Sequence, residues 1–152
     1  MLTRRSALAL FATAPAAAAL ATRARAATPD IYAEGGIAID GTDPVAYFTE
    51  SKPVAGDPSI THEWMGTTWQ FSTEDNRAAF AADPEAYAPQ FGGYCAWAVA
   101  EGYTASTVPE AWTIHEGKLY LNFSRGVRRR WERDIPGNIA RGEGNWPAVL
   151  AN

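Results

Sequence analysis

The sequence predicts a small single-domain α+β fold with two β-hairpins and three or four short helices. Two segments, 60–71 and 112–123, alternate apolar and polar residues on either side of a glycine-containing turn, a pattern typical of hairpins. Helical patterns that begin with capping residues follow both segments. The chain has 152 residues, of which 47% are hydrophobic and 12% aromatic, enough for one domain with its own core. No stretch after residue 26 is long and apolar enough to cross a membrane.

The first 26 residues have the features of a cleavable export signal. Arg4 and Arg5 precede the uncharged segment 7–21, and the Ala-Arg-Ala at 24–26 places small residues where a signal peptidase cleaves. The arginine pair resembles a twin-arginine signal, although a general secretory signal has the same three parts. We therefore expect residues 1–26 to be a signal peptide and the mature protein to be in the periplasm.

Removal of this signal would leave an acidic protein. Four of the 13 basic residues lie within the signal, so residues 27–152 contain nine basic and 17 acidic side chains, a net charge of −8. A charge of this sign repels nucleic acid and anionic lipid surfaces, so we expect no nucleic-acid partner. A periplasmic protein and a small ligand are the partners left open.

Glycines break up the apolar pattern of residues 27–42, which are therefore expected to form an irregular N-terminal arm. The domain is expected at 43–152. Asp43-Pro44 opens it with a short apolar segment. Two prolines and a glycine within 51–59 then indicate a loop before the first hairpin.

The first hairpin is predicted from strands at 60–65 and 68–71, around a glycine-first pair suited to a type II′ turn. This register pairs Trp64 with Trp69 and places His62 on the same apolar face. A histidine among aromatic residues is more often bonded to backbone in a core than a metal ligand.

Three features place the middle helices. Ser72 is expected to cap a helix after the first hairpin, and Asp83-Pro84 to begin a shorter one. A further helix is predicted at 94–101, directly after Gly92-Gly93. Cys95 therefore falls in the first turn of this helix.

The second hairpin is predicted from strands at 112–115 and 118–123. Its register pairs Trp112 with Leu121 on the buried face. Tyr120 lies on the opposite face, and His115 lies beside the turn, where it is expected to be exposed.

Ser124 is expected to cap a last helix that runs through Asp134 and is stopped by Pro136. Five arginines form a basic run on this helix: Arg125, Arg128, Arg129, Arg130 and Arg133. The run is either a solvated helix face, with Glu132 and Asp134 nearby, or a site for an anion or an acidic partner.

A set of motifs links the first half of the domain to a known family. The motifs are Asp43-Pro44-Val45, Gly66-Thr67-Thr68-Trp69-Gln70-Phe71-Ser72, Asn76-Arg77, Phe80 and Asp83-Pro84-Glu85-Ala86-Tyr87. In this combination the segment 40–90 resembles the YHS domain family. The remainder, 91–152, looks like the extension of an exported subgroup of that family, which has a Gly-Gly-Tyr-Cys-Ala element, here at 92–96. The resemblance implies an association with metal.

This chain departs from the family at the cysteines of its metal-handling members. Those positions hold Ala46, Ser72 and Asn76, none of which supplies a thiolate. The cysteine ligands of the family are therefore not implied here. The single cysteine of the chain, Cys95, lies in the 92–96 element instead.

The sequence supports two opposite expectations for Cys95. A position at the start of a helix stabilises a thiolate and lowers the pKa of the thiol. A position on one helical face with Ala98 and Val99 indicates a packed thiol with a raised pKa.

Three functions follow from these observations. The leading hypothesis is an exported protein associated with copper or another soft transition metal, with Cys95, His62 and His115 as the candidate ligands. The second is a thiol redox or peroxide-reactive protein that uses Cys95 as its nucleophile. No Cys-x-x-Cys is present, which excludes a dithiol mechanism within one chain. The third is a non-catalytic module that binds a ligand or a protein.

Overall fold

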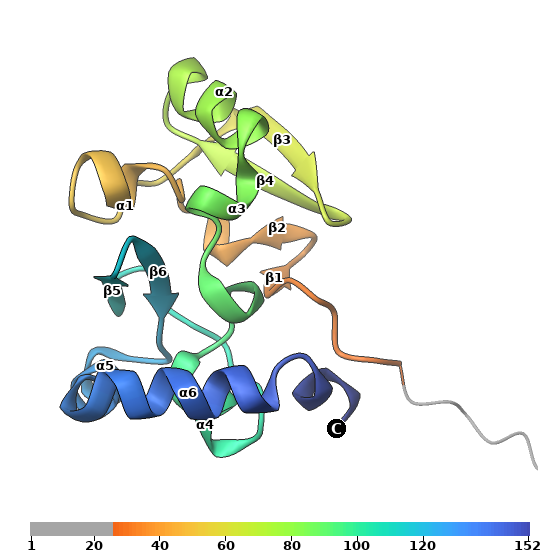
Figure 1. Ribbon diagram of the computed structural model, residues 1–152. Coiled ribbons are helices and arrows are strands. Elements are labelled where there is room, and N and C mark those ends of the chain that lie inside the picture. Colours follow the sequence, from red (N-terminus) through yellow and green to blue (C-terminus); the bar gives the residue numbers. More distant parts are fainter. Residues whose placement is uncertain (1–25) are drawn as a thin grey trace, which may run out of the picture.

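The computed structural model describes residues 26–152, and its architecture confirms the predicted α+β class. Residues 1–25, and with them the predicted export signal, lie outside the described residues. A four-stranded mixed sheet and a separate two-stranded hairpin are joined and covered by short helices (Figure 1). Within residues 26–152, no helix has the length and apolar character needed to cross a bilayer.

The four-stranded sheet includes the segment predicted to be an irregular arm, so that prediction was wrong. Its strands are β1 (Ala33–Glu34), β2 (Ile37–Ala38), β3 (Asp57–Trp64) and β4 (Thr67–Phe71), in the order β1-β2-β4-β3. Gly35 and Gly36, both with positive φ, form the turn between β1 and β2. Because β2 then runs parallel to β4, the turn glycines connect two strands instead of marking an arm.

The β3–β4 hairpin has a different register from the predicted one. His62 faces Trp69 and Trp64 faces Thr67, a shift of two residues. The turn lies at Met65-Gly66, where both residues have positive φ, as a type I′ turn requires. A shift of two residues leaves every side chain on its predicted face, so the buried face was predicted correctly despite the wrong register.

The second hairpin confirms the predicted register. Strands β5 (Trp112–His115) and β6 (Lys118–Leu121) pair Trp112 with Leu121 and turn at Glu116-Gly117. Tyr120, predicted on the opposite face from Leu121, is also buried, because its ring packs against Trp131 at 5.0 Å between centroids. The hairpin therefore has buried side chains on both of its faces.

Short helices connect and cover these strands. They are η1 (Ile39–Gly41), α1 (Ala46–Thr49), α2 (Glu74–Ala82), α3 (Pro84–Tyr87), η2 (Gln90–Gly93), α4 (Ala96–Glu101), α5 (Arg125–Trp131), η3 (Glu132–Asp134), α6 (Ile135–Asn145) and η4 (Ala148–Ala151). Ser124 caps α5 as predicted, but Thr73 caps α2 in place of Ser72. Pro136 was expected to end a helix and instead lies in the first turn of α6, where its missing N–H costs no hydrogen bond.

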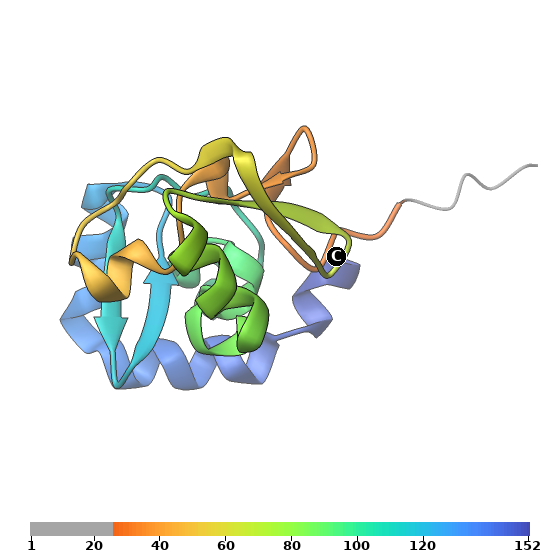
Figure 2. The ribbon, with the colours of Figure 1, turned by 90° about the horizontal axis from the view of Figure 1, so that it is seen from above.

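The elements form two regions. The four-stranded sheet with α2 and α3 makes up one, and α4, α5 and α6 make up the other, with the β5–β6 hairpin between them (Figures 1 and 2). Trp69, Phe71 and Phe80 are fully buried in the first region, and Trp131 in the second.

A buried carboxylate organises the sheet region. Asp43 is fully buried, and its Oδ1 accepts hydrogen bonds from the backbone N–H groups of Val45 (2.9 Å) and Ala46 (3.3 Å). Its Oδ2 accepts from the Ser72 N–H (2.8 Å), the Ser72 hydroxyl (2.7 Å) and the Asn76 carboxamide (2.8 Å). Asp43 therefore joins the start of α1 to the end of β4 and to α2.

Asp43→Asn is expected to lower the free energy of unfolding by about 2–4 kcal/mol. The new amide nitrogen would face donors at Ser72 and Asn76 and leave them unpaired. Urea unfolding followed by tryptophan fluorescence measures the loss. Asp75→Asn makes the same change at an exposed position in the first turn of α2 and should leave the unfolding midpoint nearly unchanged. Equal midpoints for the two variants would contradict this role of Asp43.

Candidate functional site

The candidate site is a pocket of about 250 Å³ that contains the only cysteine of the chain. We call it the Cys95 pocket; its lining residues are Cys95, Trp97, Tyr103, Ala105, Phe123 and Val127. They come from the start of α4, from the loop after α4, and from the junction between β6 and α5. Apart from the thiol, the lining side chains are aliphatic or aromatic. Cys95 is the most buried of them, with 1% of its surface exposed.

Two glycines place Cys95 at the pocket. Gly92 and Gly93 have φ values of 63° and 84°, and a Cβ on Gly92 would clash with the backbone oxygen of Asp30. The glycines therefore let the chain turn tightly against the N-terminal segment, where the Tyr32 N–H donates to the Gly92 oxygen at 2.8 Å. The Gly-Gly-Tyr-Cys-Ala element is a tight turn that places Cys95 at the start of α4.

Asn122 ties Cys95 to β6 and α4. Its side chain is fully buried, and its Oδ1 accepts hydrogen bonds from the Trp97 N–H at 3.0 Å and from the Cys95 thiol at 3.5 Å. The Cys95 sulfur in turn accepts from the Phe123 N–H at 3.3 Å. The backbone of Asn122 bonds to Val108 and Ala111 on the loop before β5. The pocket walls are therefore held by one connected set of hydrogen bonds.

The thiol has the properties of a packed group. Burial raises the pKa of Cys95, and the backbone N–H groups of Ala98, Phe123 and Trp97 lower it only part of the way back. Cys95 precedes α4 as its N-cap residue instead of lying within the first turn. The expectation of a lowered pKa at a helix start was therefore wrong, because desolvation outweighs the nearby donors. The alternative expectation, a packed thiol, agrees with the structure.

The structure does not bring the three candidate metal ligands together. His62 lies on β3, where its ring packs edge-on against Phe80 at 6.1 Å between centroids. His115 lies at the tip of the β5–β6 hairpin, with its Nε2 3.9 Å from a carboxylate oxygen of Glu116. Within residues 26–152, no group of three or more His, Cys, Asp or Glu side chains is arranged to hold a metal ion. A copper ion at Cys95 would find one soft donor and neither histidine.

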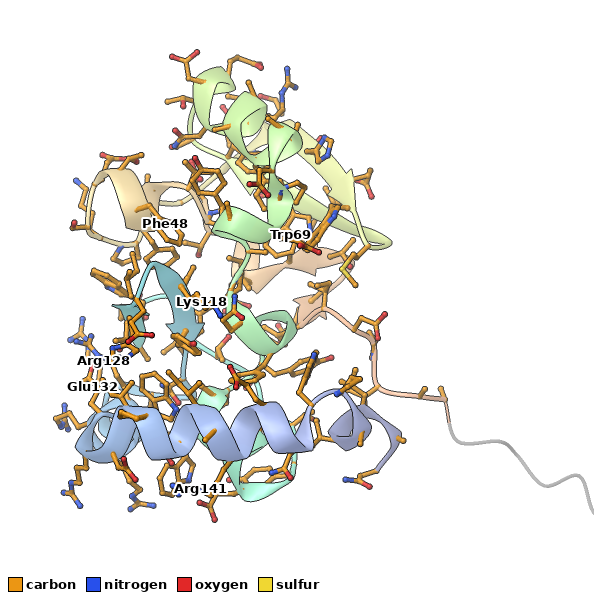
Figure 3. All side chains as sticks on the ribbon, viewed as in Figure 1. Phe48, Trp69, Lys118, Arg128, Glu132 and Arg141 are labelled. Atoms are coloured by element: carbon orange, nitrogen blue, oxygen red, sulfur yellow. The ribbon has the colours of Figure 1, made fainter. Side chains whose placement is uncertain are left out.

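Two lining residues of the pocket are exposed aromatic side chains, and a third, Trp97, lies beside an arginine. Tyr103 and Phe123 are 50% and 52% exposed, which makes them two of the few large hydrophobic side chains exposed among the described residues. The guanidinium carbon of Arg130 lies 5.6 Å from the centroid of the Trp97 ring. Arg128 is paired with Glu132 instead, at 2.8 Å, and Figure 3 shows these two side chains together at the α5 end of the molecule.

A second hollow lies on another part of the surface. It consists of two adjoining pockets, of about 330 and 400 Å³, that share Trp64, Pro89 and Trp146. Charged side chains, among them Asp30, Glu85 and Lys118, also line it. It does not contact Cys95. Its mixed lining distinguishes it from the Cys95 pocket, whose lining is almost wholly apolar.

Sequence reasoning missed three residues of the site. Asn122 directly follows a buried strand, and that position is the only sequence signal of its role. Tyr103 and Phe123 gave no signal, because an aromatic residue in a loop or at a strand end is equally typical of a core. Tryptophans occur both in the core and at the pocket: Trp69 and Trp131 are fully buried, whereas Trp97 lines the Cys95 pocket.

No protein-family model, curated protein or solved structure matches this chain. The resemblance to the YHS family therefore stays a prediction from the motifs, and the function is argued from the site itself.

Cys95 is expected to react slowly in the folded protein. Iodoacetamide should alkylate it at least about tenfold more slowly at neutral pH than in urea-unfolded protein, because the raised pKa and burial both reduce the accessible thiolate. Mass spectrometry of quenched samples measures both rates on the same single thiol. Faster alkylation of the folded protein than of the unfolded chain would identify an activated thiolate and contradict the packed thiol.

The raised pKa of Cys95 also predicts a pH dependence of stability. Above the unfolded-state pKa of about 8.5, the unfolded chain loses its thiol proton before the folded protein does. Stability should therefore fall as pH rises from this value toward the folded-state pKa. Cys95→Ser lacks this titration, so wild type should lose stability relative to the variant over this range. A difference between the two that is independent of pH would show that the thiol pKa is the same in both states.

Proposed function

We propose that this protein is an exported, non-catalytic binding module whose Cys95 pocket takes the apolar part of a small ligand. The observation that carries the proposal is an open, apolar pocket whose most buried lining group is a thiol with a raised pKa. Export rests on the signal predicted at 1–26. The proposal corresponds to the third of the functions that the sequence left open.

The exposed aromatic walls support a ligand-binding role. Tyr103 and Phe123 keep about half of their surface in contact with water in the free protein. A ligand between them would remove this apolar surface from water, at a gain of about 25 cal/mol for each Å² buried. At about 250 Å³ the pocket is slightly smaller than the range of roughly 300–1,000 Å³ typical of drug-sized ligands. The expected ligand is therefore small, with a single ring or a short chain.

The state of Cys95 favours binding over redox chemistry. A nucleophilic thiol must reach the thiolate form, and burial opposes this by raising the pKa of Cys95. The sulfur is already engaged by the Phe123 N–H and the Asn122 carboxamide. His62 and His115, the only histidines of the chain, lie on other elements and provide no nearby base. A soft metal at Cys95 likewise stays a prediction from the family resemblance, without a set of ligands to support it.

A variant that fills the pocket is expected to abolish binding. Ala105→Phe places a ring in the Cys95 pocket, so the affinity for octanamide, a neutral amphiphile, should fall at least about tenfold. Isothermal titration calorimetry measures this affinity. Ala148→Phe makes the same change at an exposed position on η4, outside the pocket, and should bind octanamide like wild type.

Circular dichroism establishes that both variants are folded before they are compared. Unchanged octanamide binding by a folded Ala105→Phe variant would place the ligand elsewhere and contradict the proposal. Absence of octanamide binding by the wild-type protein would contradict it as well.

A further inference from the structure

The charges of the protein are strongly segregated. Residues 125–141 contain six arginines against Glu132 and Asp134, a net charge of +4. The rest of residues 27–152 carries a net charge of −12. Residues 125–141, from α5 into α6, therefore form a cationic segment on an acidic protein. Anions are attracted to this segment and repelled by the remainder of the molecule.

The Cys95 pocket opens beside this cationic segment. Val127 lines the pocket, and Arg130 lies three residues further along α5, so the two side chains are neighbours on one face of the helix. The Arg130 guanidinium lies over Trp97, which lines the same pocket. The apolar side chains of Val127 and Trp97 thus lie next to the cationic guanidinium of Arg130.

Arg130 is available to a ligand. Its side chain is exposed, and among residues 26–152 no carboxylate lies within 4.0 Å of its guanidinium. Arg128, two residues earlier, is already held by Glu132 and accordingly contributes less to an anion site. A planar guanidinium binds a carboxylate through two parallel hydrogen bonds, a geometry that a lysine does not offer.

We propose that the ligand of the Cys95 pocket is an amphiphilic monocarboxylate. Its apolar chain or ring occupies the pocket, and its carboxylate binds the Arg130 guanidinium at the mouth. This inference rests on the function proposed above and specifies the ligand class. A single carboxylate matches the single guanidinium over Trp97, because Arg128 is already paired with Glu132.

Two probes of equal chain length test the carboxylate. Octanoate and octanamide differ in charge but share the apolar chain, so calorimetry on the wild-type protein isolates the contribution of the anion. Octanoate is expected to bind about five- to tenfold more tightly than octanamide at low salt. Added sodium chloride should weaken octanoate binding and leave octanamide binding unchanged.

Two variants assign this preference to Arg130. Arg130→Gln should remove the preference for octanoate and keep the affinity for octanamide, whereas Arg130→Lys should retain only part of the preference. Arg77→Gln is the matched control, because it removes the same charge from α2, in the sheet region of the molecule. It should leave both affinities unchanged. A preference that persists in Arg130→Gln would contradict the assignment.

The outcomes separate the two proposals. Equal wild-type affinities for octanoate and octanamide would overturn the monocarboxylate and leave the binding module intact. Failure of the wild-type protein to bind octanamide would overturn the binding module itself.

Discussion

The candidate site depends on the hydrogen bonds that the Asn122 carboxamide oxygen accepts. One oxygen accepts from the Trp97 backbone and from the Cys95 thiol, and so joins the end of β6 to the start of α4. The return contact, from the Phe123 N–H to the Cys95 sulfur, closes the connection. Because Trp97 and Phe123 both line the pocket, these bonds fix their relative positions before any ligand arrives. Such preorganisation lowers the entropic cost of binding.

The same contacts explain why the cysteine is suited to a binding role. A thiol buried to 1% exposure is a small, weakly polar surface, comparable to an aliphatic side chain. Its hydrogen bonds occupy the sulfur both as a donor and as an acceptor. They do not stabilise the thiolate enough to offset its desolvation, so the pKa stays raised. The groups available to contact a ligand are therefore the aromatic rings of Tyr103 and Phe123 and the guanidinium of Arg130, and not the sulfur. The proposed binding therefore relies on shape and charge and not on thiol reactivity.

The sequence allowed most of the fold to be predicted, but only part of the site. Both hairpins and their buried faces follow from alternation, which is a local property. Alternation does not determine the register of β3–β4. The turn begins at Met65, which adopts the left-handed conformation that the prediction assigned to glycine at the first turn position. The sequence indicated both effects on the pKa of the Cys95 thiol, the helix start that lowers it and the burial that raises it. Which effect is larger depends on burial by residues far along the chain. Asn122 and Phe123 lie 27 and 28 residues from Cys95, and no local pattern joins them to it.

Backbone amide chemical shifts during an octanamide titration locate the ligand on the protein. If octanamide occupies the Cys95 pocket, the largest shift changes fall within 95–105 and 123–130, including the Trp97 and Phe123 amides that bond to Asn122 and Cys95. Changes centred instead on Trp64 and Trp146, which line the second hollow, would show that the Cys95 pocket is not the binding site.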